Sequence, residues 1–420
     1  MKILKANIIL FFILFLTILH GSFFLKDNNS KYIYSDSEKY MQDIISFKLN
    51  KDFSEIATSN NLPVLYPFLS SLFINIDNSN LELKNCEILK NESCNKVAKI
   101  VRIFNYLCFI LLVFFTYKFG LAIQGKLVGY ISSFLVSLNT FFSSSISHAN
   151  PEILSALIFL LLIYVTSQIL IFPKKMTYYL LSLFFLTLLV LIKPIYIFIF
   201  FIFYILYFIL FLKKSTDISN IFFFIFTIIF FICLYFSYIT SFNQKNNYEN
   251  IYLSKGNQIL SIRAAYDTIH YNEIIPLILT FTPFFNENLL EENFTKNATN
   301  RVISSYKNRN YFLRNSDILV KNELLILNDK KLNKSDYLKV IISNFEKHLI
   351  LTPIFLYRGL FPRNHSYLYH DLLKNTFNHK LIKANIILSL LITNISIISI
   401  IMFFLISLLK INYYNLLICF

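Results

Sequence analysis

The residues best suited to chemistry follow the first apolar run of the chain, in the stretch YSDSEKYMQDI over residues 34–44. Asp36, Tyr40 and Asp43 are spaced i, i+4 and i+7, so a short helix would place them on one face. A carboxylate held in a tight geometry can accept a proton from a hydroxyl or an amine. The simpler alternative is a solvated loop, and this is the reading we expect for Asp43. The role of Glu38 stays open.

Further polar side chains stand where later apolar runs begin or end. They are Arg102, His148 with Glu152 in the stretch SHANPE, and Lys193 in the dipeptide KP. Each has an ordinary explanation, since basic side chains at helix ends reach toward water. Glu152 after a proline suits the first turn of a helix, where the helix dipole favours an acid. All of these residues are expected on one side of the membrane. This shared location is stronger evidence for a site than any single residue.

The elements that must position these residues are long apolar helices. The chain has 420 residues, of which 56% are hydrophobic and 15% charged, and a membrane-spanning helix needs about 20 largely apolar residues. We predict about eight spans, at residues 6–25, 100–121, 127–146, 152–172, 178–193, 194–212, 220–242 and 384–409. Pro194 divides one almost continuous apolar run and predicts a tight hairpin there. The fold class predicted is therefore an all-α polytopic membrane protein.

Basic residues predict how the chain is oriented. Lys pairs lie before the first span and in alternate connections after it, at 2 and 5, 118 and 126, 174 and 175, and 213 and 214. Lysines gather on the cytoplasmic side of membrane proteins, so we expect a cytoplasmic N-terminus. The first apolar run is long and ends at HGS, a poor cleavage site, so we expect a retained signal anchor. The long loops 26–99 and 243–346 then lie outside. A net charge of +15 is attributed to topology and anionic lipids, and nucleic-acid binding is rejected because no such motif is present.

Three regions follow from this layout: a seven-helix module over 1–242 that includes the outer loop 26–99, an outer region over 243–346 that could form a lid, and a C-terminal membrane region over 347–420 with at least one span. Apolar segments at 61–74 and 272–285 are expected at the membrane surface, and 348–361 is expected to be interfacial or re-entrant. Cys86 and Cys94 share the first outer loop and could form a disulfide or remain thiols. Cys108 is expected to be an inert packing residue.

Five short motifs mark the outer ends of the helices in order: D-x-x-x-Y at Asp36 and Tyr40, LPVLYP at 62–67, R-x-x-N at Arg102 and Asn105, PE at Pro151 and Glu152, and KP at Lys193 and Pro194. This order resembles the GT-C superfamily of polyprenyl-phosphate-sugar-dependent glycosyltransferases, which includes protein O-mannosyltransferases and lipid A aminoarabinose transferases. The resemblance covers residues 1–242. One departure is that many members have adjacent acids, DE, at the loop start, where this chain has Asp36 and Ser37.

The resemblance implies a function and a set of site residues. The enzyme would move a sugar from a polyprenyl phosphate to a glycan, lipid or protein acceptor, with Asp36 as the base. Lys193 and Arg102 are the cations placed for phosphate, and Tyr40, His148 and Glu152 complete the predicted substrate site. A divalent metal is possible but not demanded by the spacing of these residues. The implied location is a bacterial inner membrane, with the site facing the periplasm.

Three other classes of protein are weighed against this one. A transporter or flippase for a lipid-linked substrate would show charges midway through its spans and paired internal halves, and neither pattern is evident. A membrane scaffold predicts that Asp36 and Lys193 lie far apart. An O-antigen polymerase or ligase would have more spans and a large late outer loop, which residues 243–346 only partly imitate.

Overall fold

The structure is a computed structural model of the chain. It describes residues 2–25, 35–50, 65–74, 92–172, 175–193, 260–279, 311–326 and 332–360, together with the single positions 196, 203, 225, 229, 302, 391 and 395. Within these ranges every regular element is a helix and none is a strand. The chain divides into two compact units, Met1–Asn247 with Thr376–Phe420, and Tyr248–Asn375.

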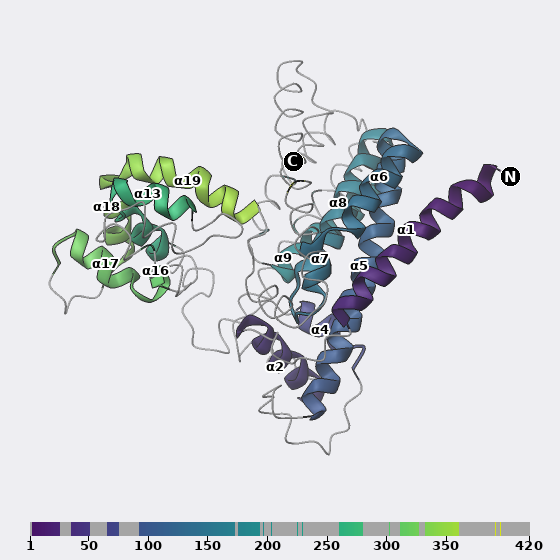
Figure 1. The fold of residues 1–420 in the computed structure, drawn as a ribbon, viewed down its shortest axis with the longest axis horizontal. Coiled ribbons are helices and arrows are strands. Elements are labelled where there is room, and N and C mark those ends of the chain that lie inside the picture. The colour runs from purple at the N-terminus through teal and green to yellow at the C-terminus, as the bar shows by residue number, and fades with distance from the viewer. Residues whose placement is uncertain are drawn as a thin grey trace. The chain divides into compact units, whose positions relative to one another are not determined.

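The first unit holds the predicted apolar helices. Its elements are α1 (Lys2–Leu25), α2 (Ser35–Asn50), α4 (Leu65–Ser71), α5 (Glu92–Gln124), α6 (Lys126–Ser137), α7 (Thr140–Ser145), α8 (Glu152–Ile171) and α9 (Met176–Ile192). In Figure 1, α1 and α8 run along α5, and α2 and α4 gather near the end where α5 begins. Two stretches, Val97–Gln124 and Glu152–Ile169, are long and apolar enough to cross a membrane. The described helices therefore allow a membrane location. The spans expected at 194–212, 220–242 and 384–409 lie outside the described residues apart from single positions.

The third predicted span, 127–146, is wrong as a single helix. It forms α6 and α7, which are separated at Leu138 and Asn139. Serines along this stretch donate hydrogen bonds to backbone carbonyls, as Ser137 does to the carbonyl of Phe134 at 2.7 Å, and such bonds compete with the helical pattern. The twelve residues of α6 rise only ~18 Å, which is less than the ~30 Å of a bilayer's hydrocarbon core.

Glycines bring α5 and α6 into close contact. Gly125 links the two helices with a φ of 89°, a left-handed conformation that glycine adopts without steric cost. A Cβ added to Gly120 would lie 2.7 Å from the Cα of Gly129. The backbones of these helices therefore cross at a distance that only small residues permit, as is common between membrane helices.

The predicted end of the fifth span is confirmed. Helix α9 stops at Ile192, and Lys193 has extended φ and ψ angles of −144° and 114°. Pro194 causes this geometry, because a proline disfavours helical angles in the residue before it. Lys193 therefore stands at the helix end, where its side chain can leave the apolar surface. Cys108 is a buried thiol on α5, as expected for a packing residue.

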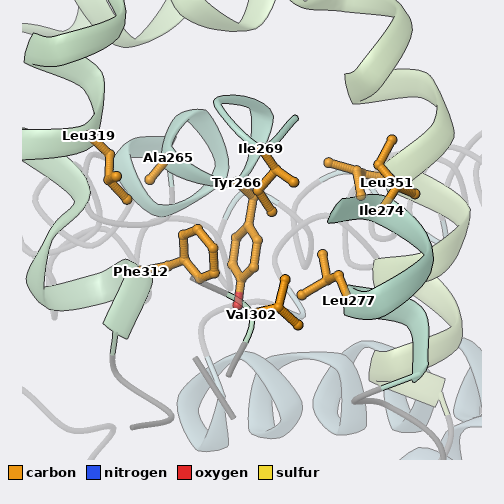
Figure 2. Packing of buried hydrophobic residues seen from close by; sticks show 9 residues of the cluster. All are labelled: Ala265, Tyr266, Ile269, Ile274, Leu277, Val302, Phe312, Leu319 and Leu351. Atoms are coloured by element: carbon orange, nitrogen blue, oxygen red, sulfur yellow. The ribbon is translucent and has the colours of Figure 1, made fainter. Parts of the chain in front are cut away.

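The second unit is a small helical body with its own core. A helical segment at 260–267 is followed by α13 (Tyr271–Leu279), α16 (Tyr311–Arg314), α17 (Ser316–Glu323), α18 (Lys334–Ser343) and α19 (Phe345–Leu360). Figure 2 shows the core, in which the rings of Tyr266 and Phe312 stack with centroids 4.0 Å apart. Leu351 of α19 is fully buried in this core. Helix α19 forms most of the segment 348–361 and also contains the expected boundary between 346 and 347.

Candidate functional site

The short helix that would place Asp36, Tyr40 and Asp43 on one face is present as α2. Asp36 occupies its second position, and the placement of the Asp36 and Glu38 side chains lies outside what the structure describes. Tyr40 is buried, with its ring edge against Tyr66 of α4 and centroids 5.4 Å apart. The predicted D-x-x-x-Y motif is thus helical, and its tyrosine packs on the LPVLYP motif.

Asp43 corrects the expectation of a surface charge. Its exposed fraction is 0%, and its neighbours Met41, Ile44 and Ile45 are also buried. Tyr40, three positions earlier and therefore on the same helical face as Asp43, is buried as well. A buried carboxylate is costly unless it is paired or hydrogen-bonded, so Asp43 joins the candidate site residues.

Two hydrogen bonds connect three of the predicted motifs. The Tyr66 hydroxyl donates to Asn105 Oδ1 at 3.1 Å, and Asn105 Nδ2 donates to the backbone carbonyl of His148 at 2.6 Å. Asn105 is fully buried on α5, so its amide bridges α4 and the SHANPE turn. Burial raises the pKa of Tyr66, which keeps the hydroxyl protonated and able to donate.

An ion pair joins the PE and KP motifs. Lys193 Nζ lies 2.6 Å from Glu152 Oε2, and each side chain is about one-third exposed, at 30% and 33%. Glu152 opens α8 and Lys193 closes α9, and these two helices pack together. Two residues predicted for one site therefore meet, although 41 positions of sequence separate 152 from 193.

The other predicted residues take up less expected roles. Arg102 is buried on α5 one turn before Asn105. His148 is half-buried and enters the network through its backbone carbonyl. Its carbonyl also accepts a hydrogen bond from the backbone of Asn150 at 2.9 Å. The side chain of Asn150 has a buried Oδ1 that accepts no hydrogen bond within the described part of the chain.

Sequence reasoning left Tyr66, Asn105 and Asp43 out of the site. Tyr66 and Asn105 belong to motifs that were recognised. Each is a polar side chain within an otherwise apolar segment, and this pattern could have indicated a buried polar role. Asp43 carried a similar signal, because it is followed by Ile44 and Ile45. The sequence around Asp43 did not decide whether its carboxylate is solvated or buried in the core.

The second unit contains a separate polar cluster. His348 Nδ1 lies 2.6 Å from Asp267 Oδ2, and Arg263 Nη2 donates to the His348 carbonyl at 2.8 Å and to Thr352 Oγ1 at 2.9 Å. Burial raises the pKa of Asp267 and lowers the pKa of Arg263. Arg263 thereby ties the segment 260–267 to α19.

A metal site is not assembled by the described side chains. No group of three or more His, Cys, Asp or Glu residues among them is placed to hold an ion. What the first unit does offer is a cation paired with an acid at the end of α9, beside a turn held by Asn105. Such a pair can exchange its partner for an anionic ligand. Comparisons with protein-family models, curated proteins and solved structures find no match for this chain.

Proposed function

We propose that this chain is a membrane glycosyltransferase that moves a sugar from a polyprenyl phosphate to an acceptor at the outer membrane surface. The observation that carries this proposal is the meeting of Glu152 and Lys193 at 2.6 Å. It is supported by the bridge from Tyr66 through Asn105 to the His148 carbonyl. Residues from motifs that lie far apart in the sequence therefore contact one another in the first unit.

The reaction would proceed by direct displacement. The acceptor oxygen or nitrogen attacks the anomeric carbon of the sugar, and the bond from that carbon to the phosphate oxygen breaks. The polyprenyl phosphate leaves with the bonding electrons, and the acceptor proton passes to the carboxylate of Asp36. Attack from the side opposite the leaving group inverts the anomeric carbon. The phosphate leaves as an anion, so one protein carboxylate is sufficient.

Lys193 would stabilise the charge that develops on the leaving phosphate. Its ammonium group pairs with Glu152, which fixes the amine at the end of α9. The donor phosphodiester carries one negative charge, as a carboxylate does, and the departing phosphate monoester gains a second, so the amine would bind it more strongly as the bond breaks. Arg102 is the second cation of the proposal, and Tyr40 with Tyr66 would form an aromatic wall beside Asp36.

The proposed partners are a polyprenyl-phosphate-linked sugar, the lipid bilayer, and a glycan, lipid or protein acceptor. The proposed location is the bacterial inner membrane, with the site on the periplasmic side. Helix α4 packs against both α2 and α9, which supports a site shared by the Asp36 helix and the Lys193 helix. A scaffold would not require this arrangement.

Purified full-length protein in lipid vesicles, given a panel of polyprenyl-phosphate sugars, tests the proposal through release of polyprenyl phosphate. Asp36→Asn should lower the rate by about 10²-fold or more, since that is the usual contribution of a positioned base. Glu38→Gln neutralises a carboxylate two positions away and decides the open role of Glu38, since retained activity would assign the base to Asp36 alone. Lys193→Ala should raise the KM for the donor.

Three outcomes would count against the proposal. Full activity of Asp36→Asn would show that Asp36 is not the base. An unchanged donor KM in Lys193→Ala would show that Lys193 does not contact the donor phosphate. Movement of the intact lipid-linked sugar across the vesicle membrane without its cleavage would indicate a transporter.

A further inference from the structure

The second unit carries a row of exposed apolar side chains along consecutive helices. Leu338 and Ile342 of α18 and Phe345 and Leu349 of α19 are all exposed, with Ile342 at 71% and Phe345 at 55%. Their spacing of four, three and four residues keeps them on one helical face. We call these four residues the apolar stripe.

The two helices form a nearly continuous support for the stripe. The backbone amide of Asn344 donates to the Val340 carbonyl at 3.0 Å, and the amide of His348 donates to the Asn344 carbonyl at 3.0 Å. The helical pattern therefore passes through the junction. The opposite face is occupied by Tyr337, Val340 and Leu351, which are buried in the unit's cores. The four side chains of the stripe therefore do not belong to either core of the unit.

Charged residues border the stripe. Lys334 and Lys339 are exposed on α18 and lie one turn from Leu338 and Ile342. Glu346 also borders the stripe, and its carboxylate accepts a hydrogen bond from the Tyr271 hydroxyl at 3.0 Å. An apolar row with lysines beside it is the pattern of a helix that lies in a membrane interface, where the lysines meet anionic headgroups.

The position of the unit within the chain favours the same partner. Tyr248–Asn375 is preceded by the apolar run 220–242 and followed by the apolar run 384–409. If both runs are spans, both ends of the unit are tethered at the bilayer surface. Tethering raises the effective concentration of the stripe at the bilayer far above that of a dissolved partner.

We propose that the apolar stripe on α18 and α19 docks the second unit onto the outer surface of the membrane, with its side chains in the boundary between headgroups and acyl chains. This inference rests on the membrane anchoring in the proposed function and is independent of glycosyl transfer. Anionic lipid would strengthen the contact through Lys334 and Lys339. A second copy of the chain and another face of the same chain are the competing occupants.

The sequence contains no tryptophan, so one substitution gives a single fluorescent reporter in the full-length protein. Ile342→Trp and Phe345→Trp report on the stripe at two exposed positions. Ile318→Trp on α17 is the matched control, since Ile318 has an exposed fraction of 57%. Leu111→Trp on α5 reports on membrane anchoring alone. The probes are brominated phosphatidylcholine vesicles, with and without phosphatidylglycerol, and acrylamide in the water.

The proposal expects brominated lipid to quench both stripe variants more than Ile318→Trp, and acrylamide to quench them less. Phosphatidylglycerol should increase the lipid quenching. Quenching equal to that of the Ile318→Trp control would overturn the proposal. Protection of the stripe variants from both probes would also overturn it and would point to a covering protein surface. If Leu111→Trp escapes lipid quenching as well, the membrane anchoring itself fails, whereas quenching there with none at the stripe rejects only the docking.

Discussion

At the scale of single residues, the bridge through Asn105 is the best-defined feature of the candidate site. Both ends of its amide are engaged, by the Tyr66 hydroxyl and by the His148 carbonyl, and the side chain is fully buried. A buried amide whose partners are both in place fixes the groups around it, because losing either partner leaves a polar atom without hydrogen bonds. Asn105 therefore positions the turn that leads to Glu152.

Tyr66→Phe tests this role. The change removes one hydroxyl and leaves the Oδ1 of Asn105 buried without its donor, which should lower the free energy of unfolding by about 1–3 kcal/mol. Thermal unfolding in detergent measures the effect. Tyr271→Phe is the control, since its hydroxyl bond to the Glu346 carboxylate is exposed and lies outside the predicted spans, where water can replace it. An equal loss in the two variants would contradict the bridging role.

At the scale of elements, α5 and α6 depend on their glycines. Replacing Gly129 by valine places a side chain against the backbone of α5, because an added Cβ would lie 2.8 Å from the Tyr117 carbonyl oxygen. Backbone cannot move aside as a flexible side chain can, so the two helices must separate.

Gly129→Val should therefore destabilise the protein by roughly 1–3 kcal/mol or more, as overpacking usually does, and thermal unfolding should show a lower midpoint. Gly125→Ala provides a comparison, since nothing lies within 4 Å of the added Cβ there but φ is +89°. Its cost should be about 1–2 kcal/mol from backbone strain alone. A neutral Gly129→Val variant would show that the close crossing is absent.

The cluster that ties 260–267 to α19 should depend on pH. Burial raises the pKa of Asp267 above its ordinary value of 3.8, and the groups facing it are Arg263, Lys347 and His348. As pH rises through 3.8, the unfolded segment loses this proton first, while the folded segment retains it up to the raised pKa. Stability from this group therefore falls over that interval and is greatest below it.

Hydrogen exchange of the α19 amides in the full-length protein, corrected for the intrinsic pH effect, measures this dependence. Protection should decrease as pH rises from below 3.8 through the raised pKa, and Asp267→Asn should flatten the decrease. Asp317→Asn is the control, because Asp317 bonds to the Tyr337 hydroxyl away from the cluster, and it should keep the slope. A slope that persists in Asp267→Asn would assign the effect to another group.

At the scale of the whole molecule, the orientation expected from the lysines can be tested at two exposed positions. Leu325 in the second unit is 92% exposed and belongs to the region expected outside. Gln124, exposed at the end of α5, belongs to a turn expected inside. A membrane-impermeant maleimide added to intact cells should label Leu325→Cys above the level of the unsubstituted chain and should not label Gln124→Cys. The reverse pattern would invert the proposed topology.

Much of the local structure could be predicted from the sequence. The apolar runs predicted α1, α5, α8 and α9, because a long unbroken apolar segment has few alternatives to a helix. Pro194 predicted the end of α9 for a local steric reason. The PE and KP motifs predicted that Glu152 and Lys193 stand at helix ends. These features are determined by residues a few positions apart in the sequence, so a local sequence pattern is sufficient to predict them.

Tertiary structure alone decided the rest. The sequence could not show that Asp43 is buried or that Glu152 pairs with Lys193. Both depend on groups distant in the chain, through the packing of α2 and α4 and the contact of α8 with α9. An acid beside a hydrophobic run has the same local pattern whether it faces water or a core. Only the neighbours brought by folding determine whether its charge is solvated, buried or paired.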